Sequence, residues 1–104
     1  KHYSPRCATM LYRFDGREDA VKQYNKSIAD GVKAYILCDD KTAKLINAEN
    51  ILNLGTTEEQ IASNLYLKLR EGEKVAQLII AIVPEKQDGV MAGVVNRLTK
   101  ACKN

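Results

Sequence analysis

The chain has 104 residues, of which 45% are hydrophobic and 28% are charged, and its formal net charge is +3. This composition is typical of one soluble globular domain and excludes an intrinsically disordered chain. The length is too short for two ordinary domains. The longest apolar run, residues 78–83, is far shorter than the roughly 20 residues that cross a bilayer, which excludes a transmembrane helix.

The charge distribution and the cysteines exclude several classes of protein. The basic residues are spread along the chain, so the concentrated basic stripe of a dedicated nucleic-acid binder is absent. Cys7, Cys38 and Cys102 include no Cys-x-x-Cys pair, and the single histidine has no partner at metal-ligand spacing. We therefore expect no metal site and no disulfide framework. We predict a cytoplasmic location, because the charged first residues also lack the apolar core of a signal peptide.

Hydrophobic periodicity and turn residues divide the first half of the chain into strands and helices. Gly31 is expected to stop the first helix, and Asp40 is expected to cap the short second helix. In chain order, the expected elements are a strand at 8–14, a helix at 17–30, a strand at 32–38, a short helix at 41–46 and a weak strand at 51–54.

The second half begins with the best-specified helix, expected at 57–71 with Gly72 near its end. Two overlapping capping boxes start it, Thr56 with Glu59 and Thr57 with Gln60. Its apolar stripe, expected to dock on the sheet, is made by Ile61, Leu65 and Leu69. The nearly continuous apolar residues at 75–83 predict a central strand that is covered on both faces, and a last helix is expected at 89–102.

The alternation of strands and helices predicts an α/β fold with parallel strands. We expect a three-layer Rossmann-like sandwich, with a mostly parallel sheet of about four to five strands flanked by helices. Such sheets bind ligands at the carboxyl ends of their strands. However, no Gly-x-Gly-x-x-Gly follows the first strand, and Gly55-Thr56-Thr57 lacks the lysine of a phosphate-binding loop. The pair Asp39-Asp40 is interpreted as a helix cap and not as a metal site.

The segment before the first strand has more side chains that could bind a nucleotide than the expected sheet edge has. It reads Lys1-His2-Tyr3-Ser4-Pro5, followed by Arg6. The lysine can bind a phosphate, the histidine and tyrosine can stack or form hydrogen bonds, and the proline holds the preceding residue extended. The alternative interpretation is an ordinary frayed terminus.

Three stretches of the chain, in order and at matching spacing, resemble one family. They are Lys1-His2-Tyr3-Ser4-Pro5, the run Glu-Glu-Gln-Ile-Ala-Ser-Asn-Leu-Tyr-Leu-Lys-Leu-Arg-Glu at 58–71, and the closing run that contains Asn96-Arg97-Leu98 and Lys100-Ala101. Together they resemble the L-threonylcarbamoyladenylate synthases. The chain departs from that family's pattern at Met91, where glycine is usual, and at Gly93, where alanine is usual.

The resemblance implies that this chain is the C-terminal domain of such a synthase. Residues 1–7 would be the end of the interdomain linker, here called the arm, and residues 8–104 a Rossmann-like accessory domain. The full-length enzyme would be a nucleotidyltransferase that converts threonine, bicarbonate and ATP, with magnesium, into threonylcarbamoyl-AMP and pyrophosphate, for threonylcarbamoyladenosine formation in tRNA. An N-terminal catalytic domain of the same chain would hold the active site, so this fragment is expected to be inactive alone and to act as a lid.

The resemblance also implies which residues lie near the nucleotide. These are the arm residues Lys1, His2, Tyr3, Ser4 and Pro5, and we expect no catalytic residue in this chain. We expect residues 1–5 to be mobile, or held only by a neighbouring molecule, when the catalytic domain is absent, because a short polar peptide cannot offset its ordering entropy.

Three residues on the last two long helices are candidates for contacts with the catalytic domain: Asn64, Asn96 and Arg97. The alternatives are that the asparagines make a buried polar contact or face solvent, and that Arg97 pairs with Glu59 or another acid or binds phosphate. A contact with tRNA is left open. The alternative function is a free-standing Rossmann-like regulatory module that binds a nucleotide or tRNA.

Overall fold

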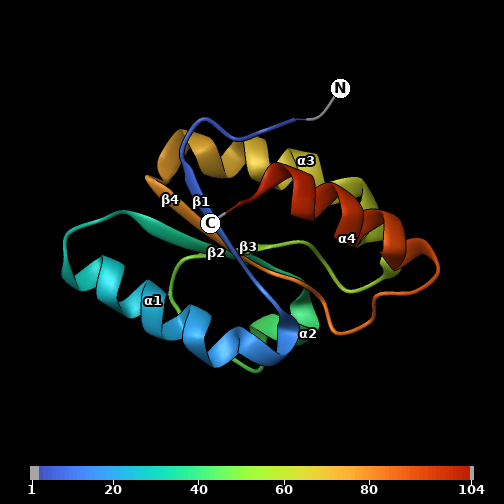
Figure 1. The fold of residues 1–104 in the computed structure, drawn as a ribbon, viewed down its shortest axis with the longest axis horizontal. Coiled ribbons are helices and arrows are strands. Elements are labelled where there is room, and N and C mark those ends of the chain that lie inside the picture. Colours follow the sequence, from blue (N-terminus) through green and yellow to red (C-terminus); the bar gives the residue numbers. More distant parts are fainter. Residues whose placement is uncertain (1–2, 104) are drawn as a thin grey trace.

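A four-stranded parallel sheet lies between two layers of helices in the computed structural model, which describes residues 3–103 (Figure 1). The strand order is β1-β4-β2-β3. The elements are β1 (Ala8–Tyr12), η1 (Phe14–Gly16), α1 (Arg17–Ala29), β2 (Ala34–Cys38), α2 (Asp40–Ala43), β3 (Ile51–Asn53), α3 (Glu58–Val75), β4 (Leu78–Ile82) and α4 (Val90–Ala101). The predicted three-layer Rossmann-like sandwich is confirmed, with four strands.

The two faces of the sheet are covered by different helices. Leu37, Ile79 and Ala81 point to the face under α3 and α4, while Ile36 and Ile80 point to the face under α1. All five side chains are fully buried. Because successive residues of a strand point to opposite faces, β2 and β4 must be apolar at every position, as the sequence pattern predicts.

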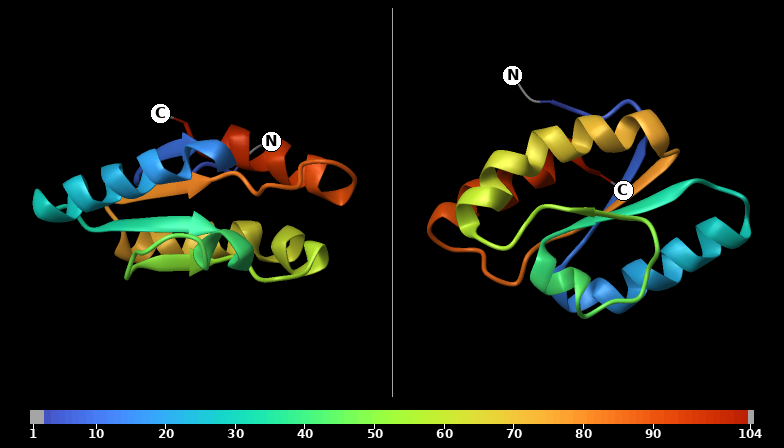
Figure 2. Two further views of the ribbon diagram at one scale, coloured as in Figure 1. Left: turned by 90° about the horizontal axis from the view of Figure 1, so that it is seen from below. Right: turned by 180° about the vertical axis from the view of Figure 1, so that it is seen from behind.

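The chain crosses the sheet twice in opposite directions. From β1 it passes through α1 to β2, and from β3 it returns through α3 to β4, which pairs with both β1 and β2. The strand arrows of β2, β3 and β4 point the same way in the left view of Figure 2. Helices α3 and α4 therefore both begin at the carboxyl edge of the sheet and end at its amino edge, where β1 starts.

Helix α3 is longer than predicted. Gly72 lies inside it and does not stop it, and the helix continues to Val75, so the next strand begins only at Leu78. The reason is packing: a Cβ atom at Gly72 would lie 2.5 Å from Cδ1 of Leu52. The glycine serves the close approach of α3 to the sheet.

Other boundaries differ by a few residues. The strand expected at 8–14 ends at Tyr12, because Phe14 begins η1. The short helix expected at 41–46 is α2, and Asp39, not Asp40, caps it by accepting a hydrogen bond from the Thr42 amide. Of the two predicted capping boxes, the structure forms the one that joins Thr57 and Gln60. No helix within residues 3–103 is long and apolar enough to span a membrane.

The packing of α3 gives a testable difference between two leucines on the same helix. Leu65 is 1% exposed and Leu67 is 44% exposed. We expect Leu65→Ala to lower the free energy of unfolding by about 2–5 kcal/mol, because it leaves a cavity beneath the helix. Leu67→Ala should cost less than about 1 kcal/mol. Chemical denaturation of both variants measures this, and equal losses would contradict the assignment of the buried face.

Candidate functional site: the arm and the sheet edges

The arm lies beside the C-terminal half of α3 and then turns into β1 (Figure 1). Two of the five predicted nucleotide-proximal residues, Lys1 and His2, lie outside the described residues. Of the other three, Tyr3 and Pro5 are half-buried and Ser4 is exposed.

Tyr3 is attached to α3 by two contacts. Its hydroxyl donates a hydrogen bond of 2.5 Å to Oε1 of Glu73, and its ring meets the ring of Tyr66 edge to face, with centroids 5.9 Å apart. The backbone amide of Arg6 donates to the same Glu73 oxygen at 3.0 Å. Hydrogen bonds to a carboxylate are stronger than those between neutral groups, and T-shaped aromatic pairs are favourable.

The domain itself thus supplies a charged acceptor and an aromatic partner for the described part of the arm, which the sequence did not predict. The expectation that the isolated segment is mobile stays a prediction. The hydrogen bond joins Tyr3 to Glu73, 70 positions away in the sequence, and local sequence patterns do not reveal a pairing over this separation.

The pKa shifts of Tyr3 and Glu73 favour the hydrogen bond between them. Burial raises the pKa of Tyr3 to about 12, and the hydrogen bond and negative charge of Glu73 add to that rise. The same hydrogen bond lowers the pKa of Glu73, and the Arg6 amide lowers it further. At neutral pH the pair is thus a neutral phenol donor and a carboxylate acceptor.

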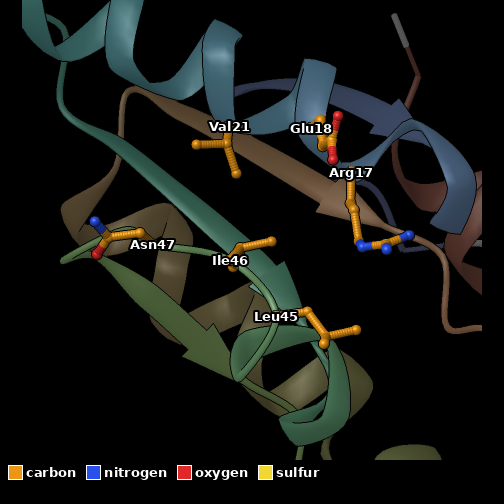
Figure 3. A pocket seen from close by; sticks show the side chains of 6 residues that line it. All are labelled: Arg17, Glu18, Val21, Leu45, Ile46 and Asn47. Atoms are coloured by element: carbon orange, nitrogen blue, oxygen red, sulfur yellow. The ribbon is translucent and has the colours of Figure 1, made fainter.

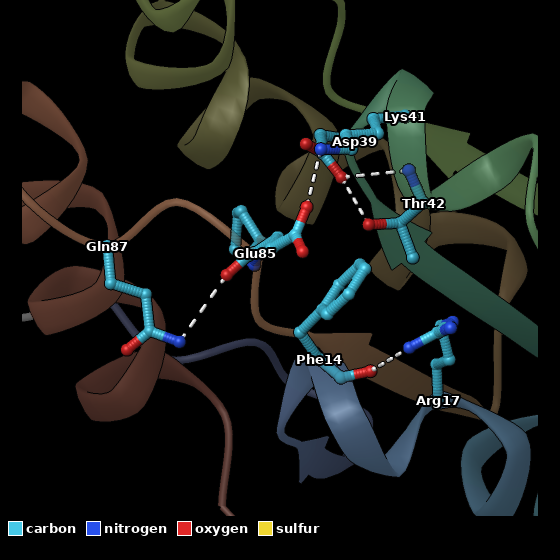
Figure 4. A network of polar contacts seen from close by, with 8 residues as sticks. Phe14, Arg17, Asp39, Lys41, Thr42, Glu85 and Gln87 are labelled. Atoms are coloured by element: carbon cyan, nitrogen blue, oxygen red, sulfur yellow. Dashed lines mark hydrogen bonds and ion pairs between the residues drawn. The ribbon is translucent and has the colours of Figure 1, made fainter.

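The opposite edge of the sheet holds a cavity of about 230 Å³ among the loops that follow β2, β3 and β4. It is lined by Asp39, Lys41, Thr56, Glu58, Ile61, Pro84, Glu85, Lys86 and Met91. Two ion pairs connect the segments around it. Lys41 of α2 pairs with Glu85 (Figure 4), and Lys86 pairs with Glu58, the first residue of α3. Each lysine at this edge already has a carboxylate partner.

The polar groups beside this cavity are used inside the domain. Oε1 of Gln60 accepts hydrogen bonds from the amides of Thr56 and Thr57, at 2.8 and 3.2 Å, so these donors at the start of α3 are not free for an anion. Asp39 accepts from the amide and the hydroxyl of Thr42 (Figure 4). These two amides and the Asp39 carboxylate are therefore engaged within the domain.

A second hollow, of about 250 Å³, lies between α1 and residues 45–47 (Figure 3). Val21, Leu45 and Ile46 make its apolar wall. The guanidinium of Arg17, at one end, donates to the Phe14 carbonyl and stacks over the Phe14 ring, 4.4 Å from its centroid. This hollow brings no set of reactive groups together.

Comparison with known families decides the identity of the domain. Residues 1–102 match the family described as "Threonylcarbamoyl-AMP synthase, C-terminal domain". The chain belongs to this family. A search of curated protein sequences found no match.

Solved structures of Sua5 proteins have the same fold. The chain is similar to P. abyssi Sua5 in complex with L-threonine, with a TM-score of 0.77, 27% identity, and coverage of 97% of this chain and 29% of that one. It is also similar to the C-terminal Sua5 domain from Pyrococcus horikoshii, with a TM-score of 0.70, 22% identity, and coverage of 96% of each chain. This threonylcarbamoyl-AMP synthase C-terminal domain thus spans less than a third of the P. abyssi chain.

The residues predicted to contact the catalytic domain do not form one group. Asn64 donates a hydrogen bond of 3.0 Å to the Leu54 carbonyl, which ties the chain after β3 to α3. Asn96 and Arg97 are exposed on α4. Within residues 3–103, Arg97 forms no ion pair with Glu59 or another acid, so that predicted pairing is wrong for the described chain.

Sequence reasoning missed Glu73, the residue that holds the arm. It lies beyond the stretch of α3 that resembles the family pattern. Tyr66 and Glu73 are two turns apart on one side of the helix, and this spacing is the one signal that associates them.

The contact with Glu73 predicts when Tyr3 ionises. At pH 11 a free tyrosine, with a pKa of about 10, is about nine-tenths ionised, whereas Tyr3 should be about nine-tenths protonated. Glu73→Gln should lower the pKa of Tyr3 only partly, because burial is the largest cause of the rise. Nuclear magnetic resonance of ring-labelled tyrosine, assigned with Tyr3→Phe, measures both values.

The sign of the linked stability follows from the raised pKa. The contribution of Tyr3 to stability is complete below pH 10, the unfolded value, and is lost as pH rises toward about 12. A Tyr3 resonance that titrates like a free tyrosine would contradict its attachment to α3.

Proposed function

We propose that this chain is the accessory, lid-forming domain of a threonylcarbamoyl-AMP synthase and has no catalytic activity alone. The observation that carries the proposal is the attachment of the arm to α3 through Tyr3 and Glu73. These hydrogen bonds support the proposal that the described part of the arm moves together with this domain.

In the proposed reaction a catalytic domain, N-terminal in the same chain, binds ATP with magnesium, threonine and bicarbonate. The threonine amine and bicarbonate form a carbamate with loss of water, and the carbamate displaces pyrophosphate from ATP to give threonylcarbamoyl-AMP. The product is a mixed anhydride that water hydrolyses, and a lid that excludes water protects it. The similar P. abyssi protein is described as a complex with L-threonine, which supports a threonine-using enzyme.

The alternative, a free-standing nucleotide-binding module, has less support. The start of α3 uses its loop amides in its own capping box, and the lysines at the carboxyl edge have carboxylate partners. A direct contact with tRNA, and a cytoplasmic location, stay predictions.

The first prediction of this function concerns activity in isolation. Incubated with ATP, threonine and bicarbonate, the 104-residue chain should release no pyrophosphate, because residues 3–103 bring together no site for the polyphosphate with one for a threonine carboxylate. The full-length enzyme, assayed in parallel, is the positive control. Catalytic turnover by the isolated chain would overturn the assignment of catalysis to another domain.

The second prediction concerns the first two arm residues. In the full-length enzyme, replacing Lys1 and His2 with alanine should lower kcat/KM for ATP tenfold or more, because a hydrogen bond to a charged group contributes about 1.5–3 kcal/mol. The melting temperature should be nearly unchanged. Lys22→Ala, which removes an exposed cation from α1, is the matched control. Unaltered kinetics in the double variant would remove the gating role of the arm.

A further inference from the structure

Basic residues that are far apart in the sequence meet at the amino edge of the sheet, where the strands begin and the long helices end. They are exposed and are here called the amino-edge cations: Arg6, Lys33, Arg70, Lys74, Lys100 and Lys103. Within residues 3–103 none of their side chains forms a hydrogen bond or an ion pair.

The strand register determines how the amino-edge cations are spaced. The first residues of β1, β4 and β2 lie in one row of the sheet, and Lys33 directly precedes this row on β2. Neighbouring strands are about 4.8 Å apart, so the starts of β1 and β2 are separated by about 10 Å. Lys103 lies at the β1 side, because its backbone exchanges hydrogen bonds of 3.0 and 3.1 Å with the Thr9 hydroxyl.

The end of α3 is joined to the same row. The Gln77 amide donates a hydrogen bond of 2.8 Å to the Lys33 carbonyl, and the Gln77 side chain accepts one of 2.9 Å from the Lys33 amide. Lys74, in the last turn of α3, is three residues before Gln77. The cations therefore extend along the edge of the sheet and do not converge on one point.

The carboxylates at this edge do not neutralise the group. Two of them pair with other lysines, Asp30 with Lys26 and Glu71 with Lys68. A third, Glu73, has a pKa that the charges of two amino-edge cations help to lower, but it is half-buried and already accepts two hydrogen bonds from the arm. The edge thus keeps an excess of positive charge.

The carboxyl edge has the opposite arrangement. The exposed cations Arg13, Lys41, Lys44 and Lys86 each pair with a carboxylate there. The carbonyl ends of helices attract cations, which accounts for Lys74 and Lys100. It does not account for Arg6 and Lys33, which belong to no helix. Uncompensated like charges repel one another, and a bound anion relieves that repulsion.

We propose that the amino-edge cations form a surface that binds the phosphate backbone of an RNA. A row of exposed cations matches a chain of phosphates, whereas a single phosphate is bound by donors that converge on it. This inference rests on the proposed function, because a synthase whose product is used to modify tRNA supplies the reason to choose RNA over an acidic protein. It gives the accessory domain a contact with the molecule that is modified.

The surface is tested in the full-length synthase with a variant that combines Lys33→Gln, Lys100→Gln and Lys103→Gln. These three lysines are chosen because their charges do not contribute to the pKa shifts of the hydrogen-bonded pair that holds the arm. Fluorescently labelled bulk tRNA is titrated at several salt concentrations. The Kd at low salt should rise about tenfold or more, and the slope of log affinity against log salt should become shallower by about 2–3, since each phosphate contact contributes about 0.7–0.9.

A second triple variant controls for net charge. Lys22→Gln, Lys44→Gln and Lys86→Gln together remove the same charge from exposed lysines outside the amino edge, and the Kd for tRNA should stay within about twofold of wild type. Equal affinities of the two triple variants would overturn the proposal. Arginine at positions 33, 100 and 103 keeps the charge and should preserve binding, so a loss of affinity there as well would also overturn it.

The catalytic domain is the alternative occupant of this edge, because the arm leaves the domain beside it. Pyrophosphate release without RNA distinguishes the two, and the glutamine variant at 33, 100 and 103 should retain wild-type release and melting temperature. A variant that loses release but keeps its affinity for tRNA would show that the edge docks on the catalytic domain, and the RNA surface would be wrong.

The inference and the proposed function fail in different ways. If the full-length enzyme forms threonylcarbamoyl-AMP and the glutamine variant binds tRNA like wild type, the RNA surface is wrong and the proposed function stands. If the wild-type enzyme forms no threonylcarbamoyl-AMP, the proposed function is wrong, whatever its affinity for tRNA.

Discussion

The insertion of β4 between β1 and β2 is the constraint on which the rest of the domain depends. β4 pairs with both neighbours along most of its length and is covered on both faces. Four of its five residues are fully buried, and each large apolar side chain contributes about 1.5–3 kcal/mol on burial. A central strand of this kind requires a helix layer on each side, which fixes α1 on one face and α3 with α4 on the other.

That topology also determines where the arm can be held. Since β4 is the last strand in the sequence and lies between β1 and β2, α3 must return across the sheet from β3 to the amino edge, where β1 begins. The final turn of α3 therefore lies beside the segment that leads into β1, and it carries Glu73. Gly72 permits this, because any side chain there would collide with Leu52 and hold the helix away from the sheet. Had the helix ended at Gly72, Glu73 would not lie on it.

The features predictable from the sequence are those encoded by neighbouring residues. The apolar run of β4, the capping box of Thr57 and Gln60, and the Leu65 stripe each depend on a few adjacent positions, and each is confirmed. The errors concern residues with more than one structural use. Glycine is common both after a helix and at close approaches, and Asp39 and Asp40 are both capable caps, so their local pattern cannot distinguish the two roles.

The candidate site was less predictable than the fold, for the same reason. The resemblance marks the arm as functional, but the partner of Tyr3 lies at the far end of α3 and is found only in three dimensions. Neither Lys1 nor His2 falls within the described residues, so their predicted roles stay predictions. The structure adds an alternation in burial along the arm. Tyr3, Pro5 and Cys7 are half-buried, whereas Ser4 and Arg6 are exposed to solvent.

A gate must be ordered enough to close and weakly held enough to open. Ordering a residue costs about 1–2 kcal/mol of backbone entropy, and a T-shaped aromatic pair returns only about 0.5–1.5 kcal/mol. Two hydrogen bonds of the arm meet at one oxygen of the half-buried Glu73, so loss of that one carboxylate removes the acceptor of both the tyrosine hydroxyl and the Arg6 amide. Because the pKa of Glu73 is lowered, this support is present above the ordinary glutamate value and is lost as pH falls through the lowered value. The described part of the arm therefore remains attached to α3 at neutral pH.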